Sequence, residues 1–268
     1  MYSMELNNKN KNIFIITTYI SKIHHITILK ECIKRIKLFH PDSDIIILND
    51  SYSVNIDFIL NDTHSVNSDF MFDSSIKIEK TKYERCGEVN AYVWACEHKD
   101  KYKSFCFIHD SVLLTNRLKN LSEKIGFRPL WYSSKNVSDN THSLDVQLIA
   151  SKIKIHNNHI FDKLRNIRIG KGSIVFGCMG IFNISFLNYL IHDTNFLENA
   201  YMFNTRYLRC FFERLLYMFL SEFYNIDNYY SYSICGDICN HGQFYHHMCI
   251  LDNNLANNPF ALKVWQGR

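Results

Sequence analysis

The sequence predicts an α/β fold with a mostly parallel central sheet flanked by helices. Two continuous apolar, β-branched segments, residues 13–19 and 44–50, are typical of strands that are buried on both faces. The segment between them, residues 24–39, carries apolar side chains at helical spacing, with Lys and Arg on its other face. A strand, a helix and a strand in this order form a unit with parallel strands and a right-handed crossover.

The same alternation continues along the first half of the chain. Pro41 closes the first helix, and residues 51–75 are polar and irregular, as in a surface loop. The further elements that we expect are a strand over 76–80, a helix over 84–98, a strand over 103–108, an extended segment over 112–114, a strand over 130–133, a loop over 134–143, an extended segment over 173–183 and helices over 185–191 and 205–223.

Composition excludes several classes of protein. Hydrophobic residues make up 47% of the chain and aromatic residues 15%, which is too many for a disordered protein. Gly (9) and Pro (3) are too scarce for a collagenous or linker-rich chain. The formal net charge of +4 is mild and no basic run is present, so we expect no nucleic-acid partner. A diphosphate ligand needs only one or two cations and fits this charge.

The cysteines favour a reducing compartment. Cys96, Cys106 and Cys210 lie in apolar periodic segments, where a free cysteine behaves as a small hydrophobe. The total of nine is odd, so at least one is unpaired. Residues 1–9 have no apolar signal core, and no apolar stretch reaches the ~20 residues that span a bilayer. We therefore expect a cytoplasmic protein without a membrane span.

Polar residues follow three of the predicted strands. Thr17 and Thr18 end the first strand, Asp50 ends the second, and Asp110 follows the strand over 103–108. Ligands of open parallel sheets bind along this carboxyl edge. A carboxylate here, such as that of Asp110, is suited to hold Mn²⁺ or Mg²⁺ against two phosphates. The alternative is an ordinary acid that caps a turn.

The segment Asp110-Ser111-Val112, with the preceding helix around 87–95, resembles the metal-binding region of the GT-A glycosyltransferases. Those enzymes place an Asp-X-Asp element after a buried strand, whereas this chain has one acid there. The layout is especially similar to that of the small glycosyltransferases of large DNA viruses. Residues 13–50 and 84–114 carry the resemblance.

The resemblance implies a single GT-A-like catalytic domain over 1–268 with a Rossmann-like sheet. Its nucleotide-binding half would be 1–115 and its acceptor-side half 116–268. The implied activity is transfer of a sugar from a nucleotide-diphosphate donor to a hydroxyl of a glycan, protein or small molecule. Mn²⁺ or Mg²⁺ would assist, and a viral member would act in the host cytoplasm.

The resemblance also assigns individual residues. Thr17, Thr18 and Tyr19 would lie beside the base and ribose, and Asp50 would reach the base or ribose hydroxyls. Glycines 177 and 180 would allow close approach of an acceptor-side strand, although ordinary turn glycines fit equally well.

Residues around Asp110 and near the end of the chain complete the implied site. His109 and Ser111 would contact the nucleotide beside the metal. Lys263 and Arg268 belong to a terminal segment that would close over the diphosphate. A late histidine, assigned to His247, would complete the metal shell.

Glu213 lies within a strongly apolar predicted helix, where an unpaired charge is costly. By resemblance, an acid there is the base that deprotonates the acceptor in inverting members. The alternative is a structural ion pair with Arg209 or Arg206 at helical spacing. Asp145 and Asp193 are further acids that could serve.

Other functions remain open at this stage. A non-catalytic nucleotide- or glycan-binding protein could have the same fold. A zinc site of Cys235, Cys239 and a nearby histidine is an alternative, but its spacing matches no familiar zinc module. No Gly-rich turn follows residues 13–19, which argues against a dinucleotide or P-loop site. No Gly-X-Ser-X-Gly elbow supports a hydrolase.

Overall fold

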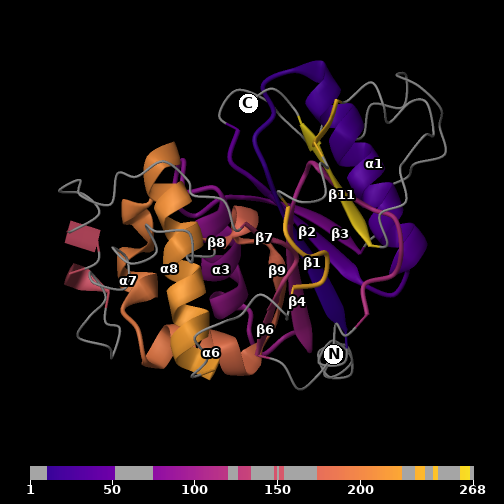
Figure 1. The fold of residues 1–268 in the computed structure, drawn as a ribbon. Helices are drawn as coiled ribbons and strands as arrows, with labels where there is room; N and C mark the ends of the chain where they lie inside the picture. Colours follow the sequence, from indigo (N-terminus) through magenta and orange to yellow (C-terminus); the bar gives the residue numbers. More distant parts are fainter. Residues whose placement is uncertain are drawn as a thin grey trace, which may run out of the picture.

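A six-stranded sheet forms the centre of the molecule (Figure 1). The computed structural model describes residues 11–51, 75–119, 126–133, 148–149, 151–153, 174–224, 233–238, 244–246 and 260–265. The strand order is β3-β2-β1-β4-β9-β6. The first four strands in this order are parallel, and β9 is antiparallel to both β4 and β6. The strands are β1 (Asn12–Thr18), β2 (Asp44–Asn49), β3 (Ile76–Lys80), β4 (Ser104–His109), β6 (Phe127–Pro129) and β9 (Gly180–Asn183).

The burial of each strand follows its place in the sheet. In the central strands β1 and β4 nearly every residue is buried, as their continuous apolar sequences predict. The edge strand β3 instead alternates between partly buried and exposed residues. The predicted α/β class, with a mostly parallel central sheet flanked by helices, is confirmed.

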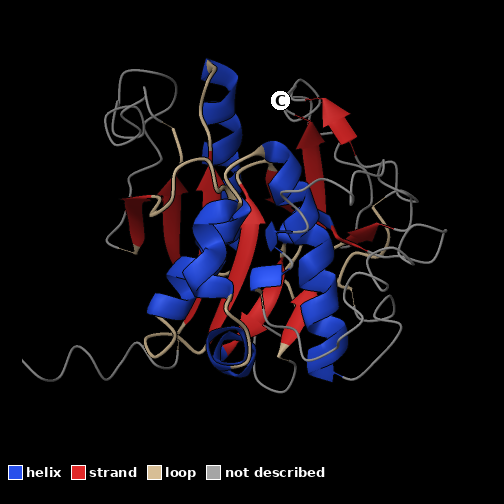
Figure 2. Cartoon of the chain, turned by 90° about the vertical axis from the view of Figure 1, so that its left-hand side faces the viewer, coloured by secondary structure: helices blue, strands red, loops and turns tan. Residues whose placement is uncertain are grey.

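Helices cover both faces of the sheet (Figures 1 and 2). Helix α1 (Ile23–Phe39) lies on one face and packs against the short strand β5 (Val112–Leu114). Helix α3 (Glu88–Glu97) lies on the other face, between the sheet and the helices α6 (Ile184–His192) and α8 (Arg206–Tyr224). Because α3 has neighbours on both sides, the residues from Val89 to Cys96 are all buried. The short helices α7 (Phe196–Asn199) and η3 (Ala200–Met202) precede α8.

Stacked aromatic rings join α3 to the sheet. The Phe182 ring of β9 is stacked with Phe105 and Phe127 on the two neighbouring strands, with ring centroids 5.7 and 5.8 Å apart. It also stacks with Tyr92 of α3 at 5.0 Å. Phe182 is fully buried. These rings therefore add to the backbone pairing that joins β9 to β4 and β6.

A second, smaller sheet has the order β10-β11-β5. It joins β10 (Phe244–His246) and β11 (Ala261–Trp265) to β5. Strand β11 runs antiparallel to β5, with Lys263 opposite Val112. This pairing brings a segment from late in the chain beside the turn that carries Asp110.

The structure corrects three boundaries that the sequence predicted. The helix expected over 84–98 begins at Glu88, because Arg85 and Gly87 have positive φ angles of 60° and 42°. The extended segment expected over 173–183 is broken into β8 (Ile174–Val175), the 3-10 turn η2 (Phe176–Cys178) and β9. The strand expected over 130–133 is reduced to β7 (Tyr132–Ser133), which pairs with β8.

None of the helices in the described part of the chain combines the length and the apolar character that crossing a membrane requires.

We predict that Phe182→Ala lowers the free energy of unfolding by about 3–5 kcal/mol, because it leaves a cavity between the stacked rings. The control is Leu38→Ala on α1, whose side chain is 69% exposed, and which we expect to change the free energy by less than about 0.5 kcal/mol. Urea denaturation measures both. Equal effects of the two substitutions would contradict the assigned role of the Phe182 ring.

Candidate functional site

The ends of β1, β2 and β4 meet at the carboxyl edge of the sheet. The Thr18 hydroxyl donates a hydrogen bond of 2.6 Å to Asp110 Oδ2. The backbone N–H of Asp50 donates to the carbonyl oxygen of Thr18 at 2.9 Å. Asp110 is only 2% exposed, and Thr17 is also buried. The structure thus brings together the polar residues that the sequence placed at this edge.

The carboxylate of Asp50 is hydrogen-bonded within the protein. It accepts hydrogen bonds from the Thr81 hydroxyl at 3.0 Å and from the backbone N–H of Arg85 at 3.1 Å. Burial raises the pKa of Asp50, against the effect of these hydrogen bonds. Asp50 therefore ties the turn before α3 to the end of β2, and its contact with a nucleotide stays a prediction. Tyr19, at the same edge, is 48% exposed.

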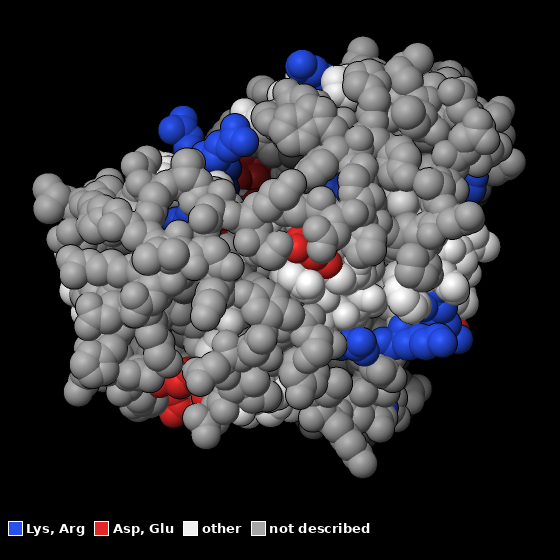
Figure 3. Space-filling model, in the orientation of Figure 1, with Lys and Arg blue, Asp and Glu red and all other residues white. Residues whose placement is uncertain are grey.

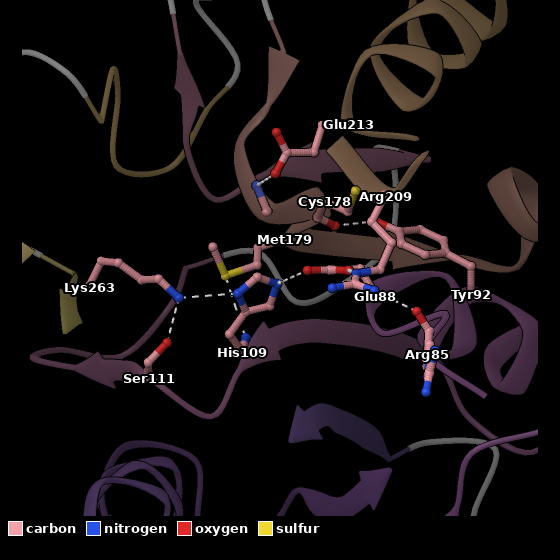
Figure 4. Close-up of polar contacts among 11 residues, drawn as sticks. Arg85, Glu88, Tyr92, His109, Ser111, Cys178, Met179, Arg209, Glu213 and Lys263 are labelled. Carbon is pink, nitrogen blue, oxygen red and sulfur yellow. Dashed lines mark hydrogen bonds and ion pairs between the residues drawn. The ribbon is translucent and has the colours of Figure 1, made fainter. Parts of the chain in front are cut away.

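The ammonium group of Lys263 contacts both residues that flank Asp110 (Figure 4). Its Nζ donates to Ser111 Oγ at 2.5 Å and lies 3.1 Å from His109 Nδ1. The backbone N–H of Val264 also donates to the carbonyl oxygen of Ser111 at 2.8 Å. Lys263 therefore contacts His109 and Ser111, and the resemblance assigns all three residues to the nucleotide.

An ion-pair network extends from the other side of the His109 ring. His109 Nε2 lies 3.5 Å from Glu88 Oε1, and Glu88 Oε2 lies 3.2 Å from Arg209 Nε. Arg209 Nη1 donates to the carbonyl oxygen of Arg85 at 2.5 Å. Because Lys263 donates to Nδ1, a neutral His109 ring carries its proton on Nε2, facing Glu88.

Sequence reasoning missed Glu88 and Arg209 as members of this site. The two residues lie on α3 and α8, so their spacing in the sequence gives no sign of a contact. The signal that could have indicated Glu88 is its place in the first turn of α3, directly after Gly87. Arg209, one of the two partners considered for Glu213, pairs with Glu88 instead.

Glu213, on α8, is linked to the surroundings of His109 through Gly177. Its Oε1 accepts a hydrogen bond of 2.8 Å from the backbone N–H of Gly177. Gly177 has a φ of 61°, and a Cβ built on it would lie 2.9 Å from His109 Cε1. Burial and, after it, the negative charge of Glu88 together raise the pKa of Glu213 to about 8. The carboxyl is thus poised to exchange a proton near neutral pH.

The described residues do not by themselves fit Mn²⁺ or Mg²⁺. Among them, no three His, Cys, Asp or Glu side chains gather closely enough to hold a metal ion. His247, predicted to complete the metal shell, and Arg268, predicted at the diphosphate, lie outside the described residues, as does Asp145. Asp193 ends α6 as an exposed C-cap residue.

The zinc alternative gains no support from Cys235. Its thiol is buried, and this burial raises its pKa to about 12. Cys239 lies outside the described residues. All seven cysteines that the structure describes are free thiols.

Basic side chains are dispersed over the face drawn in Figure 3. The described Lys and Arg residues on this face lie in separate places and form no continuous basic surface. The expected absence of a nucleic-acid partner stays a prediction.

No protein-family model matches the sequence, and no curated protein matches it. The fold is similar to that of the mannosyltransferase Ktr4p from S. cerevisiae in complex with GDP, at 11% identity and a TM-score of 0.37, over 74% of this chain and 64% of that one. It is also similar to the WbbM bifunctional glycosyltransferase in its apo structure, at 11% identity and a TM-score of 0.34, over 85% of this chain and 38% of that one. The chain therefore spans less than two thirds of the length of either protein.

We predict that Glu213→Gln changes how stability depends on pH. The pKa of Glu213 rises from an ordinary value of 4.5 to about 8 on folding, so the folded state favours the protonated carboxyl. The wild type should therefore lose stability as pH rises from 4.5 to 8, by about 2–4 kcal/mol relative to the variant. Urea denaturation at pH 5 and pH 8.5 measures this difference. The exposed Glu84→Gln is the matched control, and a variant slope identical to the wild-type slope would refute the prediction.

Proposed function

We propose that this chain is a glycosyltransferase that moves a sugar from a nucleotide-diphosphate donor to an acceptor hydroxyl. One observation carries the proposal. The Lys263 ammonium contacts the His109 ring, and the Glu213 carboxyl, with its pKa of about 8, is hydrogen-bonded to Gly177, which packs against the same ring. A cation for a departing diphosphate and a base for an incoming hydroxyl are the two groups that an inverting transfer needs.

The carboxyl edge of the sheet would hold the donor. Thr17, Thr18 and the exposed ring of Tyr19 are proposed to lie beside the base and ribose, as ligands of open α/β sheets do. Lys263 would bind the diphosphate through a charge-assisted hydrogen bond. Its hydrogen bond to Ser111 holds the ammonium in place before the donor arrives.

In the proposed reaction one bond forms, one bond breaks and one proton is transferred. The acceptor oxygen forms a bond to the anomeric carbon of the sugar, while the bond from that carbon to the diphosphate oxygen breaks. The electron pair of the broken bond stays on the nucleoside diphosphate, where Lys263 stabilises the added charge. The acceptor proton passes to the carboxylate of Glu213. A retaining reaction would not need Glu213 as a base.

Metal assistance at Asp110 stays a separate prediction. Among the described residues, no three His, Cys, Asp or Glu side chains gather into a metal site, and the proposed reaction uses only groups of the protein. The proposal for Asp110 is tested by Asp110→Ala, which should lower turnover of a donor at least ~10-fold, because the variant loses the acceptor of the Thr18 hydrogen bond and a charge next to Ser111. Thermal melting controls for the fold, and unchanged turnover would exclude a role for Asp110.

A second candidate is a nucleotide- or glycan-binding protein without catalysis. The observation that favours it is that both acids at the sheet edge, Asp50 and Asp110, are already hydrogen-bonded by groups of the chain. Calorimetry with UDP-, GDP- and dTDP-sugars, followed by assays of hydrolysis and transfer, separates the two candidates. Binding of a donor with no turnover would favour the binding protein. A failure of every donor to bind would exclude both the glycosyltransferase and a nucleotide-binding protein.

We predict that Glu213→Gln lowers the turnover number about 10²-fold or more while the affinity for the donor stays within a few-fold, because only the proton acceptor is removed. In the wild type, turnover should rise with pH and level off above about 8, when the carboxyl is ionised. Steady-state kinetics between pH 6 and 9.5 measure both effects.

The matched control is Glu222→Gln on the same helix, because Glu222 accepts a hydrogen bond from Tyr189 away from the site. This control should keep its turnover and the wild-type pH profile. A Glu213→Gln variant with the same profile as the wild type would rule out Glu213 as the base.

A further inference from the structure

A lysine ammonium contacts both neighbours of Asp110, the residue to which the resemblance assigns a metal ion. Asp110 is the single acid of the segment, and its two neighbours in the sequence are His109 and Ser111. Both neighbours contact the Lys263 ammonium, at 3.1 Å and 2.5 Å. The three residues come from β4, the turn after it and β11, and Figure 4 shows the ammonium between the histidine ring and the serine hydroxyl.

We propose that the Lys263 ammonium takes the place of a divalent cation against the diphosphate of the donor, so that donor binding by this chain needs no metal ion. The inference rests on the proposed glycosyltransferase function and concerns the same site. It identifies the ligand group as the diphosphate of a nucleotide sugar, and it assigns its charge neutralisation to one residue of this chain.

The backbone holds Lys263 in position. Strand β11 is the middle strand of its sheet, with β10 on one side and β5 on the other. Lys263 is paired with Val112, directly after Ser111, and the next residue, Val264, donates its N–H to the carbonyl oxygen of Ser111. Its neighbours Leu262 and Val264 are buried. A charge fixed in this way needs no rearrangement when the leaving group becomes negative.

The acids around this point are engaged by groups of the protein. Asp110 accepts the Thr18 hydroxyl, Glu88 lies against Arg209 and His109, and Glu213 accepts the N–H of Gly177. Mn²⁺ and Mg²⁺ need several oxygen ligands, usually including one or two carboxylates. A dication placed beside Asp110 would also lie close to the lysine ammonium, and two positive charges repel each other.

A lysine suits the proposed ligand. Phosphate oxygens accept charge-assisted hydrogen bonds from an ammonium group, which binds them as a compact point charge. The mild net charge of +4 is compatible with this arrangement, because a single well-placed cation is enough to bind a diphosphate. Loss of this cation should therefore weaken binding of nucleoside diphosphates more than binding of nucleosides.

Calorimetric titration of the full chain with UDP, GDP and dTDP, in EDTA and in Mn²⁺, tests the inference. For the nucleotide that binds, we expect dissociation constants within about threefold of each other in the two buffers. Lys263→Met should weaken binding about 10-fold or more in both buffers, because it removes a charge-assisted hydrogen bond. Lys263→Arg should restore part of the affinity, because it keeps the charge.

The matched control is Lys101→Met, because Lys101 is exposed and precedes β4, at the end of the strand away from Asp110. It should bind as the wild type does, and thermal melting checks the fold of each variant. Binding that requires Mn²⁺ and is lost in EDTA, or that survives Lys263→Met unchanged, would overturn the inference and leave the proposed function standing. If no nucleotide binds in either buffer, the proposed function itself is wrong, and the inference falls with it.

Discussion

Strand β1 has parallel partners on both sides, and this arrangement determines where the polar strand ends of the site lie. Its hydrogen bonds to β2 and β4 set one register, in which Thr17 lies opposite Leu48 on one side and His109 on the other. Because the three strands run in the same direction, their polar ends must meet at one edge. The hydrogen bond from Thr18 to Asp110 is a direct result of this register. A shift of one residue would turn each side chain to the opposite face of the sheet.

The first half of the fold could be predicted closely from the sequence. The strand expected over 13–19 is observed as Asn12–Thr18, because a continuous apolar, β-branched segment has few other ways to be buried. The second half of the fold could be predicted less closely. Gly177 and Cys178 both have positive φ angles, and their turn divides a segment that looks uniformly extended in the sequence. The direction and pairing of β9 also depend on ring contacts with distant residues, which a local pattern does not contain.

The candidate site, like the fold, could be predicted from the sequence only in part. The polar residues at the strand ends could be found because each one follows a recognisable strand. The contact between Glu88 and Arg209 could not, since it joins helices that lie far apart in the sequence. Glu213 was identified from its apolar surroundings, but its partner is a backbone N–H of Gly177 and not a neighbouring arginine. A helical spacing rule finds only partners on the same helix.

Strand β11 has a consequence for how the molecule folds. Lys263 and Ser111 are separated by 152 positions in the sequence, so their contact closes a very long loop. Contacts of this kind are costly in chain entropy and tend to form late in folding. The four parallel strands lie within residues 12–109 and can pair before β11 reaches them. Until β11 pairs with β5, the edge of the sheet lacks its lysine.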